Sequence, residues 1–374
     1  EQGAVFFNTS PLFKNRFSAA FNPAQRPTFE SLWVFVQVFL LVRTLGFGFD
    51  LDLSALVDED LVLSTRQILL PNYHGAFNPS IIKNEEGGYI LIFRYCPQPY
   101  WDPWVNYIGA CFLNDSFEPI SQPELLSNSL NSPCVKSQAE DARVFSFQDR
   151  LYLIYNDNVE VSRPWYRDRR DMYLAELKIE KGRFLLSTPL KLRHDQKYAF
   201  AFWQKNWTPF VYENCLFLSY SIQPHEILFP DLDDGSCFPC YETKTAADWS
   251  LGIIRGSSPA QLVDGEYLAF FHSGHQLTTS ISPEHPMWHY FMGAYTFSKK
   301  PPFHITKISK KPIVGDGFYS SCGQEKKVIL PGGFVVAGSR IIVAFGKDDE
   351  EIWIAELDKQ KLIDSLIAID APCD

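Results

Sequence analysis

The chain has 374 residues, a formal net charge of −10 at pH 7 and a sequence pI near 5.3. A chain of this length can bury a large core in one domain or two. The acidic balance argues against the basic face with which nucleic-acid-binding proteins neutralise phosphates, so we expect no nucleic-acid partner.

The first 64 residues lack the alternation of apolar and polar side chains that is typical of strands. We predict that residues 1–64 form an extension that packs on the main domain, with a helix over 28–45. Residues 32–49 are apolar and nearly long enough to span a bilayer, but Gln37 and Arg43 interrupt them. A buried helix is therefore the preferred interpretation. Association with a membrane is not expected, although this stretch leaves it open.

From about residue 65 a pattern repeats five times: a turn with Gly, Asp or Asn, followed by an aliphatic and aromatic strand. The period of roughly 50–75 residues is in the range of a four-stranded propeller blade with long loops. We predict an all-β protein with a five-bladed β-propeller over residues 65–374. A sandwich or a β-helix would also contain many strands, but neither naturally repeats the same strand pair five times. The five strand signals lie at 87–94, 149–155, 213–220, 264–271 and 338–345.

Four copies are followed by a second strand that carries a small residue, at 108–112, 173–177, 291–295 and 352–357. The third copy is less regular, and its expected partner strand is 250–254. In a propeller the inner strand of each blade ends at a central channel, so polar side chains at equivalent strand ends should meet in one pocket.

Each copy does carry polar side chains next to its signature strand. Taken singly, these segments have ordinary structural explanations, such as a turn or a core histidine. Together they place Asn, Asp, Arg, Lys, His and Tyr at equivalent points of five repeats, which a propeller does not need for stability. The segments are 77–80 with Arg94, 140–143, 205–209 with Tyr220 and His225, 255–259 with His272, and 346–349.

The central segment is Glu140-Asp141-Ala142-Arg143, at the start of a strand. An arginine beside a carboxylate can hold the acid in place, which suits a site where a proton is delivered from a fixed direction. From this segment alone, a buried structural ion pair at a turn is the preferred interpretation, because ion pairs often only fix geometry.

The eight cysteines are irregularly spaced, and most fall in apolar strand patterns where Cys behaves as a small hydrophobe. Cys237 and Cys240 are the only close pair, and no second pair or suitably spaced histidines accompany them. We expect mostly free thiols and no metal site.

These segments together resemble the five-bladed propellers of glycoside hydrolase family 130, which are β-mannoside phosphorylases with some hydrolases and a related group of β-1,2-mannosyltransferases. The resemblance covers most of residues 65–360. The chain departs from the family at Ala142, where Pro is usual, and around His272, and the N-terminal extension has no counterpart. The similar segments are Phe77-Asn-Pro-Ser with Arg94 (Asn-Pro/Gly-small with a downstream arginine), Glu140-Asp141-x-Arg143 (Glu-Asp-Pro-Arg), Lys205-Asn-Trp (Lys-Asp/Asn-Trp), Arg255-Gly-Ser-Ser-Pro with His272-Ser-Gly (Gly-Gly-x-Pro and Tyr-His-Gly), and Gly346-Lys-Asp-Asp349 (Tyr-Gly-x-x-Asp).

The resemblance implies inversion at a mannosyl anomeric carbon, with Asp141 as the general acid. An inverting glycosidase needs a second carboxylate to activate water, whereas phosphate is itself the nucleophile of a phosphorylase. Phosphate needs a cationic cradle, for which Arg94, Lys205 and His272 are the candidates. One arginine between residues 163 and 170 could add to it. The side chains expected to bind the sugar are Asn78, Arg143, Lys205, Tyr220 and Asp349.

The expected partner is a mannoside or oligosaccharide, and the expected co-substrate is inorganic phosphate or mannose 1-phosphate, with no other cofactor. Three alternatives stay open: a β-mannosyltransferase with a nucleotide-sugar donor, an inverting β-mannoside hydrolase and a non-catalytic glycan-binding propeller. The joint presence of Asp141, Arg143, Arg94 and His272 argues against the last. A homo-oligomer is compatible with the sequence.

Overall fold

A computed structural model describes the greater part of the chain from Phe49 onward, and Phe49–Asp374 form one compact unit. The predicted helix over 28–45 lies outside the described residues. Residues 49–64, which we assigned to the extension, belong to the same unit as the strands and contain the 3-10 helix η1 (Ser54–Leu56). The described ranges are 49–97, 105–126, 137–158, 170–194, 203–320 and 325–369.

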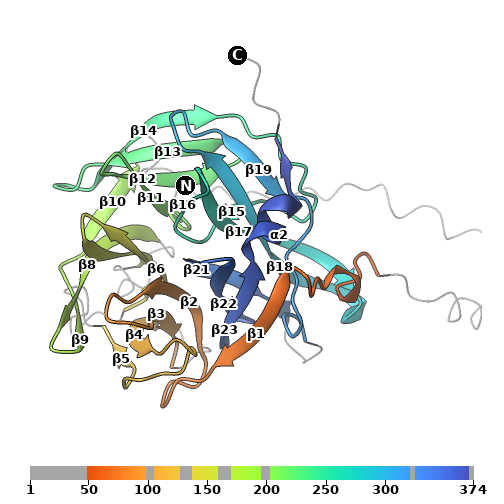
Figure 1. Ribbon diagram of the computed structural model, residues 1–374, viewed down its shortest axis with the longest axis horizontal. Coiled ribbons are helices and arrows are strands. Elements are labelled where there is room, and N and C mark those ends of the chain that lie inside the picture. Colours follow the sequence, from red (N-terminus) through yellow and green to blue (C-terminus); the bar gives the residue numbers. More distant parts are fainter. Residues whose placement is uncertain are drawn as a thin grey trace, which may run out of the picture. The chain divides into compact units, whose positions relative to one another are not determined.

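Strands dominate the described residues, whose only α-helix is α2 (Lys359–Ser365), so the predicted all-β class is confirmed. They form four hydrogen-bonded sheets (Figure 1). In one sheet β1 (Val62–Ile68) pairs with β23 (Glu351–Asp358), so the beginning of the described chain is joined to its end. That sheet also contains β22 (Arg340–Lys347) and β21 (Ile329–Ala337). A second sheet contains β2 (Ala76–Lys83), β3 (Tyr89–Tyr95), β4 (Tyr107–Leu113) and β5 (Glu124–Leu125).

The third sheet has nine strands in two antiparallel groups. The groups are joined only where β10 runs parallel to β14, in the pairs Arg193↔Ser236 and His194↔Cys237. The first group is β6 (Glu140–Phe147), β7 (Arg150–Asp157), β8 (Asp171–Glu180), β9 (Arg183–Leu186) and β10 (Leu190–His194). The second is β11 (Thr208–Tyr212), β12 (Cys215–Ile222), β13 (His225–Pro230) and β14 (Ser236–Thr243).

The fourth sheet is built on a long hairpin of β17 (Glu266–Thr279) and β18 (Ser282–Ser298). The 49–64 segment touches the tip of this hairpin, because Asp50 accepts hydrogen bonds from the backbone and the hydroxyl of Thr278. The remaining strands are β15 (Arg255–Gly256), β16 (Gln261–Val263), β19 (Ile305–Ser309), β20 (Lys326–Lys327) and β24 (Leu366–Ala368).

All five predicted signature strands exist, as β3, β7, β12, β17 and β22, and four of the predicted partner strands exist as β4, β8, β18 and β23. The prediction for the third copy was wrong, because β12 pairs with β13 and residues 250–254 contain no strand. The chain turns at Gln223-Pro224 straight into β13, and the apolar 250–254 stretch is instead a loop that exposes Ile253. The five-bladed arrangement stays a prediction.

The small residue of the second strand has a packing reason in two copies. Gly109 on β4 lies opposite Phe93, and Gly293 on β18 lies opposite Phe271. A Cβ on either glycine would lie 2.2 Å from the facing ring. The aromatic ring of the signature strand therefore lies over its partner strand, where only glycine leaves room for it.

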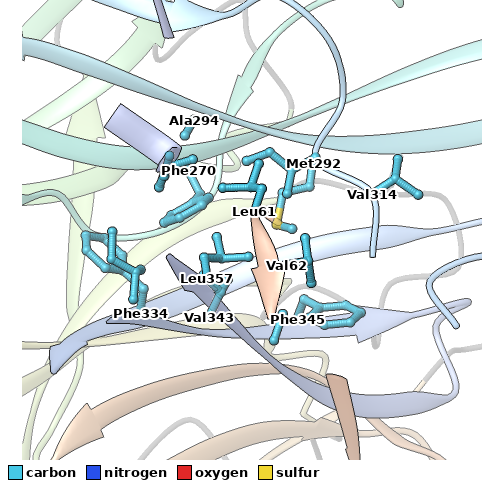
Figure 2. Close-up of a cluster of buried hydrophobic side chains, with 14 of the residues drawn as sticks. Leu61, Val62, Phe270, Met292, Ala294, Val314, Phe334, Val343, Phe345 and Leu357 are labelled. Carbon is cyan, nitrogen blue, oxygen red and sulfur yellow. The ribbon is translucent and has the colours of Figure 1, made fainter. Parts of the chain in front are cut away.

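The largest described core cluster joins the hairpin sheet to the sheet of β1, β21, β22 and β23 (Figure 2). Phe270 and Met292 from the hairpin meet Phe334, Val343 and Leu357 from the other sheet. Burying each large apolar side chain stabilises the fold by about 1.5–3 kcal/mol relative to leaving it exposed. Packing of this kind holds the sheets in fixed positions, which the site requires.

Candidate active site

A cavity of about 1320 Å³ opens among the ends of these sheets. It is larger than the roughly 300–1,000 Å³ of most small-molecule sites. Arg143, one of the predicted sugar-binding residues, does not line it. The predicted site residues that do line it are Asn78, Arg94, Asp141, Lys205, Tyr220, His272 and Asp349.

Two bulges aim Asn78 and Asp141 at one another. The β2–β3 register shifts at Asn78-Pro79, and the β6–β7 register shifts at Asp141-Ala142. Asn78 has φ +46° and Asp141 has φ +53°, in the left-handed region that Asn and Asp tolerate better than most residues. A bulge redirects a side chain out of the regular alternation. Here Asn78 Nδ2 donates to Asp141 Oδ1 at 2.8 Å, across two sheets.

Asp141 is a turn carboxylate surrounded by cations. Arg94 donates to the same Oδ1 at 3.3 Å. Burial on its own would raise the pKa of Asp141, but Arg94, Arg143, Lys205 and the hydrogen bond from Asn78 hold that pKa well below its usual range. Asp141 is therefore ionised at neutral pH.

Glu140 forms ion pairs with three cations of the site. It is 3% exposed, and its two oxygens bind three cations: Arg94 at 2.9 Å, Arg170 at 2.9 Å and Lys205 at 2.9 Å. Burial would raise the pKa of Glu140, but these three cations lower it below its ordinary value. Since Arg94 lies on β3 and Lys205 lies in the loop before β11, one buried carboxylate fixes two separate parts of the chain beside Asp141.

Arg143 holds the backbone of the same turn. Its guanidinium is buried and donates to the carbonyl oxygen of Asp141 at 2.6 Å and to that of Ser257 at 2.5 Å. Burial lowers its pKa, and Asp141 opposes that shift. This geometry suits positioning of the Asp141 turn, and the predicted contact of Arg143 with sugar stays a prediction.

Asp349 reaches the cluster from the turn after β22. Its Oδ1 lies 3.4 Å from Asn78 Nδ2, and its Oδ2 is paired with Lys326. Asn78 therefore bridges two carboxylates. Its neighbour Asp348 is buried and accepts a hydrogen bond from the backbone of Val328, and burial raises its pKa.

His272 is buried and lines the same cavity. Its Nδ1 lies 2.6 Å from the hydroxyl of Ser257. Burial, with Arg255 and Arg143 nearby, lowers the pKa of His272 to about 3, so the ring is neutral at physiological pH. Such a ring contacts a ligand as a neutral hydrogen-bonding group and adds no charge.

Tyr220 lines the cavity from β12, with its ring packed edge-on against Trp207 at 5.4 Å and His194 at 4.8 Å between centroids. Of the 163–170 arginines only Arg170 is described. It is buried, binds Glu140 and donates to the carbonyl of Gln138 at 2.7 Å, and it does not line the cavity.

Sequence reasoning missed four residues of this site. Glu140 was part of the central motif but was given no role of its own. Arg255 stood in a predicted polar segment, and Lys326 stood in none. Trp203, 62% exposed, lies two residues before Lys205, whose ammonium is 5.4 Å from its ring. An exposed tryptophan in a cavity wall offers the flat, amphipathic face on which sugars pack. In the sequence, the signal that could have identified Trp203 is a tryptophan so close to the Lys205 segment.

Within the described ranges, no group of three or more His, Cys, Asp or Glu side chains could hold a metal ion. In the same part of the chain, no helix is long and apolar enough to cross a membrane. Cys111, Cys215 and Cys240 carry free thiols, and burial raises the pKa of Cys111 to about 12.

The sequence matches no family model and no curated protein. Solved structures do share its fold. A beta-1,2-mannobiose phosphorylase from Listeria innocua, in complex with beta-1,2-mannobiose, is 15% identical with a TM-score of 0.53, over 80% of this chain and 92% of that one. A GDP-Man-dependent mannosyltransferase from Leishmania mexicana is 11% identical with a TM-score of 0.50, over 80% and 90%.

A third structure comes from work on the GH130 family of mannoside phosphorylases and the glycoside hydrolases within it that target beta-1,2 mannosidic linkages in Candida mannan. It is 12% identical with a TM-score of 0.55, over 79% of this chain and 87% of that one. The resemblance to glycoside hydrolase family 130 is thus confirmed as a likeness of fold. The relatives include three reaction types, so the reaction of this chain has to be argued from its own residues.

Proposed function

We propose that this chain is a mannoside-active enzyme that transfers a mannosyl group to or from phosphate with inversion, and that Asp141 is its proton donor. The likeness of fold to mannoside phosphorylases supports the substrate class. The cluster around Asp141 supports the reaction type.

The observation that carries the proposal is an excess of positive charge immediately around the two carboxylates of the Asp141 turn. Arg94, Arg143, Arg170 and Lys205 surround Glu140 and Asp141. The cations outnumber the carboxylates even when Asp157, which interacts electrostatically with Arg170, is counted. A buried excess of charge is costly unless an ion of opposite sign completes it. The chain as a whole is acidic, so this local excess favours an anionic ligand such as phosphate.

The proposed reaction needs no second carboxylate, because phosphate itself attacks the sugar and all bonds and protons are accounted for. In phosphorolysis an oxygen of hydrogen phosphate bonds to the anomeric carbon while the glycosidic C–O bond breaks on the opposite face. Protonated Asp141 gives its proton to the departing oxygen, directly or through a sugar hydroxyl, and recovers one from the mannose 1-phosphate formed. Synthesis is the reverse.

The spacing between Asp141 and Asp349 argues against Asp349 as the water-activating base of an inverting hydrolase. Asp349 is the carboxylate nearest to Asp141 through the shared donor Asn78. Two oxygens bonded to one nitrogen lie closer together than the roughly 6.5–9.5 Å between the acid and base of an inverting hydrolase. Asp349 is also neutralised by Lys326. Asp349 and Asn78 therefore suit binding of sugar hydroxyls.

A mannosyltransferase with a nucleotide-sugar donor is the second candidate. The size of the cavity and the fold shared with a GDP-Man-dependent mannosyltransferase favour it. Such an enzyme would use the same cation excess for the phosphates of its donor.

The test is incubation of the purified chain with mannose 1-phosphate and a panel of acceptors, beside a parallel set with GDP-mannose. Wild type is compared with Asp141→Asn and with Asp115→Asn, an exposed aspartate paired with Lys83 outside the cavity. Phosphate released with product only from mannose 1-phosphate, and lost in Asp141→Asn alone, supports the phosphorylase. Product only from GDP-mannose supports the transferase.

Two results would contradict the proposal. Undiminished activity of Asp141→Asn would remove Asp141 from the chemistry. A lack of turnover with every donor, together with binding of mannosides, would indicate a non-catalytic glycan-binding protein.

A further inference from the structure

Arg255 differs from the other cations that line the cavity. Arg94 and Lys205 are both bound to Glu140 at 2.9 Å, and Lys326 is paired with Asp349. Arg255 is exposed, and among the described residues it forms no ion pair. An anion that approaches Arg94 or Lys205 also meets the carboxylate that holds it, whereas an anion that approaches Arg255 does not.

The sheet register places Arg255 beside His272. Strand β15 pairs antiparallel with β17, with Arg255 directly opposite His272. Side chains of directly opposed residues stand on the same face of a sheet, with Cβ atoms about 4.5–5.5 Å apart. Both residues line the cavity. The guanidinium and the imidazole therefore face the same volume.

Gly256 brings this pair close to the Lys205 turn. A Cβ at Gly256 would lie 2.7 Å from the carbonyl oxygen of Asn206 and 2.9 Å from the side chain of Thr208. Glycine thus allows β15 to pack directly against the backbone that follows Lys205. The cavity wall runs from Lys205, held by Glu140, to Arg255, which has no counter-ion among the described residues.

His272 can supply a hydrogen bond without charge. When the Ser257 hydroxyl donates to Nδ1, the ring carries its proton on Nε2, the nitrogen left for a ligand. A guanidinium beside a neutral N–H donor suits a phosphoryl group, because the guanidinium forms paired charge-assisted hydrogen bonds with two oxygens and the imidazole takes a third.

We propose that Arg255 is the principal anion contact of the phosphoryl-binding site, on the outer side of the cradle that Arg94, Lys205 and His272 are predicted to form. The ligand class is the phosphoryl group carried by inorganic phosphate, a sugar 1-phosphate or a nucleoside-diphosphate sugar. The inference rests on the proposed function and deepens it, because it assigns the principal anion contact to Arg255, a residue outside the predicted cradle.

The test is equilibrium binding by calorimetry of inorganic phosphate, mannose 1-phosphate, GDP-mannose and, as an uncharged ligand, β-1,2-mannobiose. The proteins are wild type, Arg255→Gln, Arg255→Lys, Lys326→Gln and Arg150→Gln. Arg150 is an exposed arginine outside the cavity, loosely paired with Glu176 at 3.7 Å. Lys326 is a cavity cation that Asp349 already neutralises.

We expect Arg255→Gln to weaken binding of the phosphate-bearing ligands by about 10- to 100-fold, because charge-assisted hydrogen bonds are lost. The affinity for mannobiose should not change. Arg255→Lys should fall between wild type and Arg255→Gln. Lys326→Gln should have a smaller effect than Arg255→Gln, and Arg150→Gln none. The ligand whose affinity falls most in Arg255→Gln identifies whether the site binds inorganic phosphate, a sugar 1-phosphate or a nucleoside-diphosphate sugar.

Phosphate affinity within twofold of wild type in Arg255→Gln, or a larger loss in Lys326→Gln, would overturn the inference and leave the proposed function standing. Wild-type protein that binds mannobiose but none of the three phosphate ligands would overturn both, in favour of hydrolysis or glycan binding.

Discussion

Glu140→Gln is the sharpest perturbation of the charge cluster. The substitution keeps the shape of the side chain and removes one negative charge from a group that is 3% exposed and bound to three cations. Arg94, Arg170 and Lys205 stay close together with their common counter-ion gone. Breaking a buried ion pair by removing one partner typically costs about 3–5 kcal/mol, because the other charge is left uncompensated.

That loss is a large part of the roughly 5–15 kcal/mol that stabilises a typical domain. With about 2 °C per kcal/mol for large domains, we expect the Tm of Glu140→Gln to fall by roughly 6–10 °C. The substitution also enlarges the excess of cations. Phosphate should therefore bind the variant more tightly and restore more of its Tm than it adds to wild type, because ligand stabilisation grows with the ratio of ligand concentration to Kd.

The assay is thermal unfolding of both proteins across a phosphate series at constant ionic strength. The matched control is Glu176→Gln, whose partly exposed carboxylate lies 3.7 Å from Arg150 and should be worth less than about 1 kcal/mol. A Tm within 2 °C of wild type, or a phosphate response no larger than that of wild type, would refute the argument that Glu140 holds together a cluster with too much positive charge.

Three further predictions follow. The lowered pKa of Asp141 stabilises the folded wild type above about pH 4, so its free energy of unfolding in urea should exceed that of Asp141→Asn near neutrality. This difference between the two proteins should shrink as the pH falls below about 4. A difference that does not change with pH would show that ionisation of Asp141 does not contribute to stability. The His272 ring should show no NMR titration between pH 5 and 8, since its pKa is about 3, and a midpoint near 6.5 would contradict its burial. Gly109→Ala should lower the free energy of unfolding by about 1–3 kcal/mol through overpacking against Phe93, and Phe93→Leu in the same chain should recover part of it.

The sequence predicts the strands well because their signal is local. Each signature strand is an aliphatic and aromatic run that follows a turn residue, so β3, β7, β12, β17 and β22 can be found without knowledge of their neighbours. Pairing over long distances leaves no such signal. Nothing around Val62 indicates that β1 pairs with β23, almost the whole described chain away. The third partner strand was misplaced because the apolar residues at 250–254 belong to a loop, in which Ile253 and Ile254 line the cavity.

The site likewise contains residues that the sequence can identify and residues whose position it cannot predict. Asn78, Asp141 and Asp349 could be predicted because bulges and turns need Asn or Asp at positive φ, which leaves a mark in the sequence. The direction of a long side chain leaves none. Arg143 and Arg255 both belong to polar segments of the predicted repeats, yet one guanidinium is buried against two backbone carbonyls and the other lines the cavity. Which of them meets a ligand depends on the packing of separate sheets.

The charge of bound phosphate would also resolve an apparent conflict in the proposed role of Asp141. A general acid must carry a proton, yet the cations around Asp141 keep its pKa low. Phosphate bound between Lys205 and Arg255 would offset those cations, and its own charge would repel the carboxylate, so both effects raise the pKa of Asp141 toward the range in which an acid can act. The residues that bind the nucleophile would then also control the protonation of the acid. An enzyme built in this way is poor at hydrolysis without phosphate, because water brings no charge to compensate the cluster.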